Sequence, residues 1–432
     1  MKLADIPIFG NLSKLTVLFQ GHTIAAPFAA ELLAENGAKV ICLESSISPD
    51  MARVSAEPLG FWAEHRNQLG INLNLVEPEG QEVFLNLLKK IDIFFEGNKG
   101  GAMASWGLTD EVMWEANPKL VIVHISGFGQ TGVREYVTRT SFDPIGQAFS
   151  GYMFLNGYPN QEPLRVNPYV CDYDTALFAC WSALAAYIGA QQTGKGESVD
   201  VSQFESMLKL QYSYPTCYFQ KGEIKTRMGN DDPVVIGFGC MPCKDGNHVF
   251  ISCAARGPIR SMIRFLGFEN DPLYSHAIQL LRRGDPASEK LDAAIKAYCL
   301  SENASDVDKK MLEIGVPCSM IHNIETIKDN PHVQAREVFT EWEDQRFGTI
   351  GGVNVIPKMK VRPGKIWGAA PDWGGDNEDI LIELGYDQEQ IHELYEKRIM
   401  SKTPGNGGYK ATPEKMNTMR PKEKLLKKET NH

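Results

Sequence analysis

Residues 15–43, LTVLFQGHTIAAPFAAELLAENGAKVICL, decide the fold class of this chain. The apolar run at 15–19 predicts a short buried strand, and 39–43 predicts a second one. Between them, residues 27–36 predict a helix that has a proline in its first turn and stops at Gly37. Continuous apolar strands separated by an amphipathic helix are typical of a parallel sheet that is covered on both faces.

The same alternation continues through the first third of the chain. Residues 79–90 predict a helix with one apolar face, and residues 91–95 predict a strand. Thr109 is a predicted N-cap of a further helix, which Asn117-Pro118 ends, and residues 120–125 (LVIVHI) predict the next strand. This part of the chain is therefore expected to form an α/β domain with a parallel sheet.

The pattern divides the chain into four regions. Residues 1–220 are predicted to form the first part of a large α/β domain, and residues 221–316 a smaller α+β domain with a hairpin at 241–253. Residues 317–400 return to the large domain through two helices. Residues 401–432 carry eight Lys or Arg and three Asp or Glu and few apolar residues, so we expect a disordered basic tail.

Composition excludes several classes of protein. The chain has 432 residues, a formal charge of −10 and 43% apolar residues, as expected for a globular protein of two or three domains. Its acidity disfavours nucleic-acid binding, and no apolar run is long enough for a membrane span. Nine scattered cysteines and the absence of a signal-peptide pattern at the start predict a cytoplasmic protein with no membrane partner.

Two glycine-rich motifs match nucleotide-binding patterns, but the neighbouring residues lack the features that such a site needs. Residues 127–132 (GFGQTG) follow a predicted strand, but residues 133–142 lack a helical period and no second strand is expected to deliver an acidic residue. Residues 189–195 nearly match a P-loop, but Gly196 stands where a Mg²⁺-binding Ser or Thr is needed. We interpret the second motif as the end of a helix followed by a turn. An NAD(P)-dependent oxidoreductase that uses the first motif remains an alternative.

A third motif has the spacing of a zinc site. Cys240, Cys243, His248 and Cys253 would place alternate ligands on opposite faces of a predicted hairpin, so we interpret them as an ordinary hairpin with buried thiols and predict no metal site. The sequence also contains no nucleophile elbow, no zinc-protease motif and no kinase signature.

Asp172 is the residue that most clearly points to chemistry. It lies in NPYVCDYD, directly before an apolar helix predicted at 173–192 to be buried on nearly every face. One interpretation is a helix N-cap. The other is a nucleophile, because a carboxylate is ionised at neutral pH and attacks an activated acyl group without a general base. Glycine-rich backbone would supply hydrogen-bond donors for the developing oxyanion.

The order of motifs along the chain resembles the class III (formyl-CoA transferase-like) CoA-transferases, most closely their carnitine and bile-acid branch. The resemblance covers roughly residues 8–398 and rests on eight segments: FGNL at 9–12, IAAPF at 24–28, DIFFEGNKG at 92–100, NPKLVI at 117–122, SGFGQTG at 126–132, QAFSGY at 147–152, TGKGESVDV at 193–201 and PGKIW at 363–367.

This resemblance implies a reaction and a fold. Asp172 would attack an acyl-CoA thioester to give an acyl-aspartyl anhydride, then an aspartyl-CoA thioester, and a free carboxylic acid would leave as its CoA ester. Coenzyme A and acyl-CoA would be substrates, and no permanently bound cofactor, ATP or metal would be required. The large domain would be Rossmann-like, and two subunits would interlock as a homodimer.

The resemblance also implies how CoA is bound. Lys99 matches the family's CoA-contacting lysine, and Asn98, Asn67 and Gly127 match positions that line the CoA groove. Residues 237–239 (GFG) resemble a mobile glycine loop of the family.

One position departs from the family. Relatives carry an arginine shortly after the lysine, where this chain has Ser105-Trp106. Arg53 and Arg66 are candidates to replace the missing phosphate contact, and Trp106 is a candidate to stack on adenine.

The identity of the acid is the least determined feature. Tyr169, Tyr173, Trp181 and Phe149 would suit a trimethylammonium group, so we rank a carnitine or crotonobetaine substrate first. The same aromatic residues would also pack a bile acid or a 2-hydroxy acid of amino-acid fermentation, which remain as alternatives. A non-catalytic CoA-binding relative is a further alternative.

Overall fold

The computed structural model describes residues 1–55, 59–232 and 234–402, which divide into two compact units. Of the described residues, the large unit contains those in Met1–Tyr152 and Arg165–Pro215 and those from Glu337 to Lys402, and the small unit contains those in Met153–Leu164 and Thr216–Arg336. Most of the predicted basic tail, residues 403–432, lies outside the described residues.

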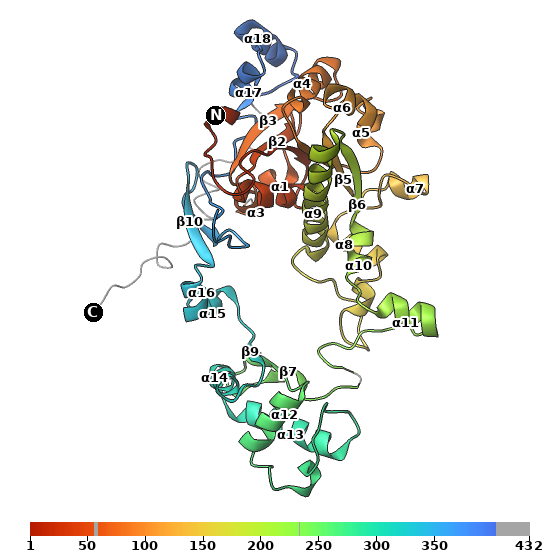
Figure 1. The fold of residues 1–432 in the computed structure, drawn as a ribbon, viewed down its shortest axis with the longest axis vertical. Helices are drawn as coiled ribbons and strands as arrows, with labels where there is room; N and C mark the ends of the chain where they lie inside the picture. Colours follow the sequence, from red (N-terminus) through yellow and green to blue (C-terminus); the bar gives the residue numbers. More distant parts are fainter. Residues whose placement is uncertain (56–58, 233, 403–432) are drawn as a thin grey trace, which may run out of the picture. The chain divides into compact units, whose positions relative to one another are not determined.

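The large unit is built on a six-stranded sheet in which every pair of neighbours is parallel, with the order β3-β2-β1-β4-β5-β6 (Figure 1). This result confirms the predicted α/β class and the Rossmann-like sheet. The strands are β1 (Thr16–Gly21), β2 (Lys39–Ser45), β3 (Gln68–Leu73), β4 (Ile93–Gly97), β5 (Val121–Ser126) and β6 (Glu197–Ser202).

Helices cover both faces of the sheet because alternate strand residues point to opposite sides. Val17 and Phe19 contribute to an apolar core shared with helices α1 (Ala25–Glu35) and α9 (Val170–Thr193). Leu18 contributes to the opposite core, which includes side chains of α4 (Pro78–Leu88), α6 (Asp110–Ala116), α17 (Asn377–Glu383) and α18 (Gln388–Glu396).

The apolar strands and most long helices of the large unit confirm their predictions within a few residues, but β3 and β6 were not predicted. β3 is completely buried although it contains Gln68 and Asn72, and β6 contains Glu197 and Asp200. A search for continuous apolar runs does not find these strands, because polar residues interrupt them. The Asn72 side chain is tolerated because its Nδ2 donates to the backbone carbonyl of Ser401 and its Oδ1 accepts the backbone N–H of Ser401, both at 2.9 Å.

The prediction that α9 is buried on nearly every face is wrong for this chain. Its buried face consists mainly of small residues such as Ala176, Ala179 and Ala183, which allow the helix to lie close to the sheet and to α1. Its large residues Trp181 and Ile188 are 60% and 58% exposed. Within the described residues, neither α9 nor any other helix has the length and apolarity needed to cross a membrane.

The small unit has its own core and a three-stranded antiparallel sheet. Strands β7 (Phe238–Pro242) and β8 (His248–Ser252) confirm the predicted hairpin, and β9 (Cys318–Met320) pairs with β8. Helices α12 (Arg256–Phe265), α13 (Pro286–Ser301) and α14 (Ala304–Ile314) pack on it, and the shorter elements are η2 (Met153–Leu155), η3 (Pro272–Tyr274), α15 (Ile324–Lys328) and α16 (Pro331–Ala335).

The cysteines of the zinc-like motif belong to this small unit. Cys243 and Cys253 are buried in its apolar core, whereas His248 is exposed. Across residues 1–55, 59–232 and 234–402, no group of three or more His, Cys, Asp or Glu side chains is arranged so that it could hold a metal ion.

The remaining short elements are η1 (Leu3–Asp5), α2 (Met51–Val54), α3 (Leu59–Glu64), α5 (Ala102–Ser105), α7 (Arg134–Val137), α8 (Asp143–Phe149), α10 (Gln203–Lys209), α11 (Tyr214–Lys221), β10 (Phe339–Asp344) and β11 (Gly348–Val353). β10 and β11 pair as a separate antiparallel hairpin of the large unit.

Candidate active site

A cavity of about 240 Å³ lies within the large unit at the carboxyl ends of β1, β4 and β5. The sheet order changes direction between β1 and β4, and ligands of open parallel sheets bind outside the strand ends at such a point. The lining residues are His22, Thr23, Ala25, Ala26, Met51, Gly97, Asn98, Lys99, Ile125, Ser126, Gly127, Arg139, Thr140, Ser141, Phe142, Asp172 and Gln203.

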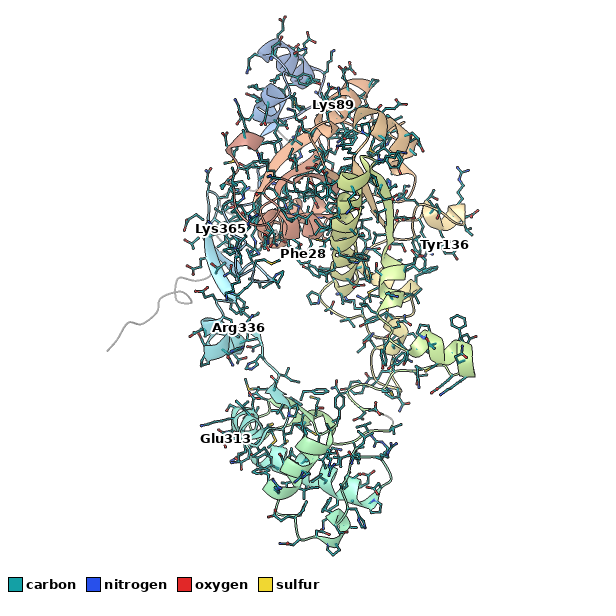
Figure 2. The ribbon with its side chains drawn as sticks, viewed as in Figure 1. Phe28, Lys89, Tyr136, Glu313, Arg336 and Lys365 are labelled. Carbon is teal, nitrogen blue, oxygen red and sulfur yellow. The ribbon has the colours of Figure 1, made fainter. Side chains whose placement is uncertain are left out.

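Four of the five predicted site residues line this cavity, namely Asp172, Lys99, Asn98 and Gly127. Asn67, the fifth, is fully buried and is not among the lining residues. Its side chain donates to the backbone carbonyl of Lys365 at 2.6 Å and accepts from the backbone of Trp367 and Gly368. Lys365 is labelled in Figure 2. The structure therefore uses the Asn67 side chain to hold residues 365–368.

Asp172 lies in the first turn of α9 and is 7% exposed. The N-cap position belongs to Tyr169, whose side chain makes no capping bond. Instead, Asp143 of α8 accepts the backbone N–H of Cys171 at 2.8 Å and that of Asp172 at 3.4 Å. The N-cap interpretation of Asp172 is therefore wrong, and its carboxylate is left for another role.

The surroundings of Asp172 make its carboxyl a weaker acid than the sequence suggested. Burial, and to a smaller extent the charges of Asp143 and Glu64, raise its pKa to about 7, although an N–H of Gln203 opposes the shift. Gln203 Nε2 donates to Asp172 Oδ1 at 2.5 Å. Within the described residues, Oδ2 makes no hydrogen bond. The expectation that Asp172 is already ionised at neutral pH needs correction, because the buried carboxyl has a pKa of about 7 rather than its ordinary value of 3.8.

The Gln203 side chain is itself oriented by a second bond. Ser141 Oγ donates to Gln203 Oε1 at 2.7 Å, which turns the amide nitrogen toward Asp172. Ser141 also lies against Gly127, where an added Cβ would be 2.1 Å from the serine Cβ. Only glycine at position 127 allows this approach, so the two segments form one wall of the cavity.

Two cations line the cavity. Lys99 follows β4, and Arg139, which the sequence analysis did not single out, lies on the segment after α7. The Arg139 guanidinium is 5.4 Å from the ring centre of Phe128. Both cations are exposed and face a cavity that also contains the Asp172 carboxylate. Such a pair suits a phosphate-bearing ligand.

The two arginines proposed from sequence have other partners. Arg53 pairs with buried Glu44 at 2.5 Å, and Glu44 in turn accepts the backbone N–H of Asp50 at 2.9 Å. Arg66 pairs with Glu31 and Glu35, both of which are buried. Arg139 is therefore a better candidate than either for a phosphate contact.

Trp106 is partly buried against the apolar core of α4 and α6. Its backbone carbonyl accepts from Gln81 Nε2 at 2.7 Å. This packing accounts for the residue without a stacked adenine.

None of the four aromatic residues proposed for substrate recognition is among the residues that line the cavity. The Tyr173 hydroxyl donates to Glu64, and its ring meets Phe28 of α1 edge-on at 4.8 Å (Phe28 is labelled in Figure 2). Phe149 packs in an aromatic cluster, whereas Tyr169 and Trp181 are 47% and 60% exposed.

The glycine motif at 127–132 differs from its prediction in two details. Residues 134–137 form one helical turn, α7, and a second strand does deliver an acid. Asp200 of β6 accepts the backbone N–H of Gln130 at 2.8 Å, so the acid anchors the loop itself. The motif at 189–195 is confirmed as a helix end, because Gly194 caps α9 with φ +73°.

Comparison with known proteins identifies the family of this chain. A family model described as CoA-transferase family III matches residues 12–377. The chain is 42% identical over 401 residues to the bile acid CoA-transferase BaiK of Clostridium scindens, covering 92% of this chain and 91% of that protein.

Solved structures show the same fold. A CAIB/BAIF family protein from Brucella suis superposes with a TM-score of 0.75 at 24% identity, and the match covers 87% of this chain and 100% of that protein. Rv3272 from Mycobacterium tuberculosis gives 0.73 at 17% identity, covering 86% and 99%. Because the family match spans most of its length, the chain belongs to CoA-transferase family III and is a CoA-transferase.

Proposed function

We propose that this enzyme transfers CoA from an acyl-CoA to a free bile acid, with Asp172 as the nucleophile that carries the acyl group and then CoA. The observation that carries the proposal is the arrangement at the head of α9. Asp143 satisfies the helix N-terminus, which leaves the buried Asp172 carboxylate in a cavity with Lys99 and Gly127.

In the first half-reaction, a carboxylate oxygen of Asp172 attacks the thioester carbonyl of the donor. The C–S bond breaks, CoA leaves as a thiolate, and a mixed anhydride forms. The thiolate then attacks the Asp172 carbonyl carbon, which releases the donor's acid and leaves an aspartyl-CoA thioester. A carboxylate removed from water is a stronger nucleophile, and the raised pKa of Asp172 reflects that desolvation.

In the second half-reaction, the acceptor carboxylate attacks the aspartyl thioester and again forms an anhydride. The thiolate then attacks the acyl carbon of the acceptor, which leaves as its CoA ester and restores Asp172. Overall, one thioester and one free carboxylate are replaced by another thioester and another free carboxylate, so the exchange needs no energy source. Lys99 and Arg139 would hold the CoA phosphates throughout.

The choice of a bile acid as acceptor rests on the similarity to BaiK along almost the whole chain. The apolar cavity side chains Ala25, Ala26, Met51 and Ile125 suit a hydrocarbon ligand. The aromatic residues proposed for a trimethylammonium group do not line this cavity, so we rank a carnitine-type acid below a bile acid.

The test is an exchange assay with a panel of acids. The enzyme is incubated with several acyl-CoA donors and a bile acid, carnitine or a 2-hydroxy acid, and the CoA esters are identified by mass spectrometry. We expect the bile acid ester to form fastest. If the CoA ester of carnitine formed faster, carnitine would be the better choice of acceptor. If no new CoA ester appeared, the transferase mechanism would be contradicted.

The role of Asp172 is tested in the same assay with Asp172→Asn. Asparagine still accepts the N–H of Gln203, and the helix cap comes from Asp143, so the fold should be unchanged. We expect exchange to be lost and no adduct to form at residue 172 when the enzyme is treated with donor and then trapped with hydroxylamine. Retained exchange would rule out the nucleophile.

We also propose that the enzyme is a homodimer that buries the outer face of α9. Leu177, Trp181 and Ile188 are each more than half exposed on a helix whose other face packs on the sheet. Light scattering after size-exclusion chromatography should give twice the mass of one chain, and Trp181→Glu should weaken the assembly. If the protein without substitutions had the mass of a single chain, the proposal would be contradicted.

A further inference from the structure

A histidine between two carboxylates lies behind the cavity. His124 of β5 is 7% exposed, with Nδ1 3.0 Å from Glu96 Oε2 of β4 and Nε2 3.0 Å from Asp110 Oδ1 of α6. A carboxylate only accepts hydrogen bonds, so both ring nitrogens donate only if the ring is the charged imidazolium.

A third carboxylate, that of Asp200, is on the strand next to His124 in the sheet. In the register of the strands, His124 is the partner of Glu96 on β4 and of Asp200 on β6. Glu111 of α6 lines a neighbouring cavity together with these residues. One cation therefore lies among the acidic groups of three surrounding elements.

Two of these carboxylates hold the two loops that line the active-site cavity. Glu96 Oε1 accepts the backbone N–H of Asn98 at 2.8 Å, which shapes the turn that carries Lys99. Asp200 Oδ2 accepts the backbone N–H of Gln130 in the loop that begins at Gly127.

The two loops are also joined directly. The backbone N–H of Gly101 donates to Gln130 Oε1 at 3.1 Å. His124 is therefore the charged centre of a network that connects loop 97–101 with loop 127–130.

We propose that His124 is a positioning residue whose positive charge holds loops 97–101 and 127–130 in the arrangement that binds CoA. This inference rests on the proposed function, because it assigns both loops to CoA binding. Without the cation, the carboxylates of Glu96, Asp110 and Asp200 would repel one another. Glu96 and Asp200 would then no longer be held in place to accept the backbone N–H groups of the two loops.

The ionisation of His124 and Asp110 agrees with the geometry. Although burial opposes it, hydrogen bonds and charge from Asp110 and Glu96 raise the pKa of His124 to about 9. The pKa of Asp110 is lowered by its bond to His124 despite burial. Because the folded pKa lies above the ordinary value of 6.5, the stabilisation is complete below pH 6.5 and is lost as the pH rises through about 9.

The test compares CoA binding and exchange in the unchanged protein, His124→Gln and His124→Asn. Neither amide carries the positive charge, and each has both of its N–H donors on one nitrogen instead of on two separate ring nitrogens. We expect the Kd for CoA and the KM for acyl-CoA to rise about tenfold, with a smaller change in kcat, because a charge-assisted network is lost rather than the nucleophile. His392→Gln is the control, since His392 is 72% exposed and, among the described residues, pairs with exposed Glu396 alone.

The pH dependence separates positioning from a merely structural role. In the unchanged protein and in His392→Gln, the Kd for CoA should rise as the pH passes about 9, and this rise should be absent in the His124 variants. An unchanged Kd in a folded His124 variant, or the same pH dependence in all proteins, would overturn the proposal.

A second measurement remains decisive if the variants do not fold. Hydrogen exchange of peptides covering 97–101 and 127–130 in the unchanged protein should lose protection, relative to the intrinsic rate, between pH 8 and about 10. Constant protection would overturn the proposal. If the unchanged protein exchanged no CoA at all, the proposed function would fail instead, which distinguishes the two outcomes.

Discussion

Replacing Gln203 by leucine should move the pH dependence of the enzyme to higher pH. The Gln203 side chain is 7% exposed and donates from Nε2 to Asp172 Oδ1 at 2.5 Å, a bond that stabilises the charged carboxylate. A buried hydrogen bond to a charged group is worth about 1.5–3 kcal/mol. At about 1.4 kcal/mol per unit, its loss raises the pKa of Asp172 by about 1–2 units above the present value of about 7.

The consequence at neutral pH is large. The ionised fraction of Asp172 at pH 7 would fall from about half to roughly 1–10%, and kcat/KM would fall by about 5–50-fold. The loss should be recovered as the pH rises toward 9, because the nucleophile itself is intact. The assay is kcat/KM for acyl-CoA across this range, since that parameter reports ionisation of the free enzyme.

Ser141→Ala is the matched control for Gln203→Leu. It removes the bond from Ser141 Oγ to Gln203 Oε1 and leaves the amide nitrogen able to donate to Asp172. We expect a much smaller displacement of the acidic limb in this variant. A Gln203→Leu profile that superimposes on that of the unchanged enzyme would refute the reasoning about Asp172.

Three further predictions concern charges around the site. Asp143→Asn keeps a cap acceptor but removes a negative charge that raises the pKa of Asp172, so the acidic limb of kcat/KM should move below pH 7; a move to higher pH would contradict the assigned electrostatics. Arg66→Leu leaves its two buried glutamate partners without a cation and should lower the free energy of unfolding by about 3–5 kcal/mol, measured by urea denaturation. An unchanged urea concentration at the unfolding midpoint would show that these ion pairs contribute little to stability. Lys99→Ala and Arg139→Ala should each weaken CoA binding by about tenfold at low salt in calorimetry, and equal affinity in either variant would remove that residue from the phosphate contact.

Local sequence determined the parts of the fold that depend on local chemistry. Apolar runs such as 39–43 and the Thr109 cap predicted their strand and helix, because burial period and capping are properties of neighbouring residues. The same criterion missed β3 and β6, which contain polar residues. Asn72 of β3 and Asp200 of β6 bond to distant segments, whereas the buried Gln68 amide has no hydrogen-bond partner among the described residues. The position of Asp172 before an apolar helix, together with the family resemblance, was enough to single it out.

The tertiary structure alone decided the state of that residue and its partners. Asp143 and Gln203 lie 29 and 31 positions from Asp172 and carry no local signal that connects them. Only the packing of α8 and α10 against α9 brings them together, and burial there raises a pKa that the isolated sequence places near its ordinary value. The linkage of His124 to both loops likewise arises from the parallel register of β4, β5 and β6, since pairing between strands is set by the whole sheet and not by any one segment.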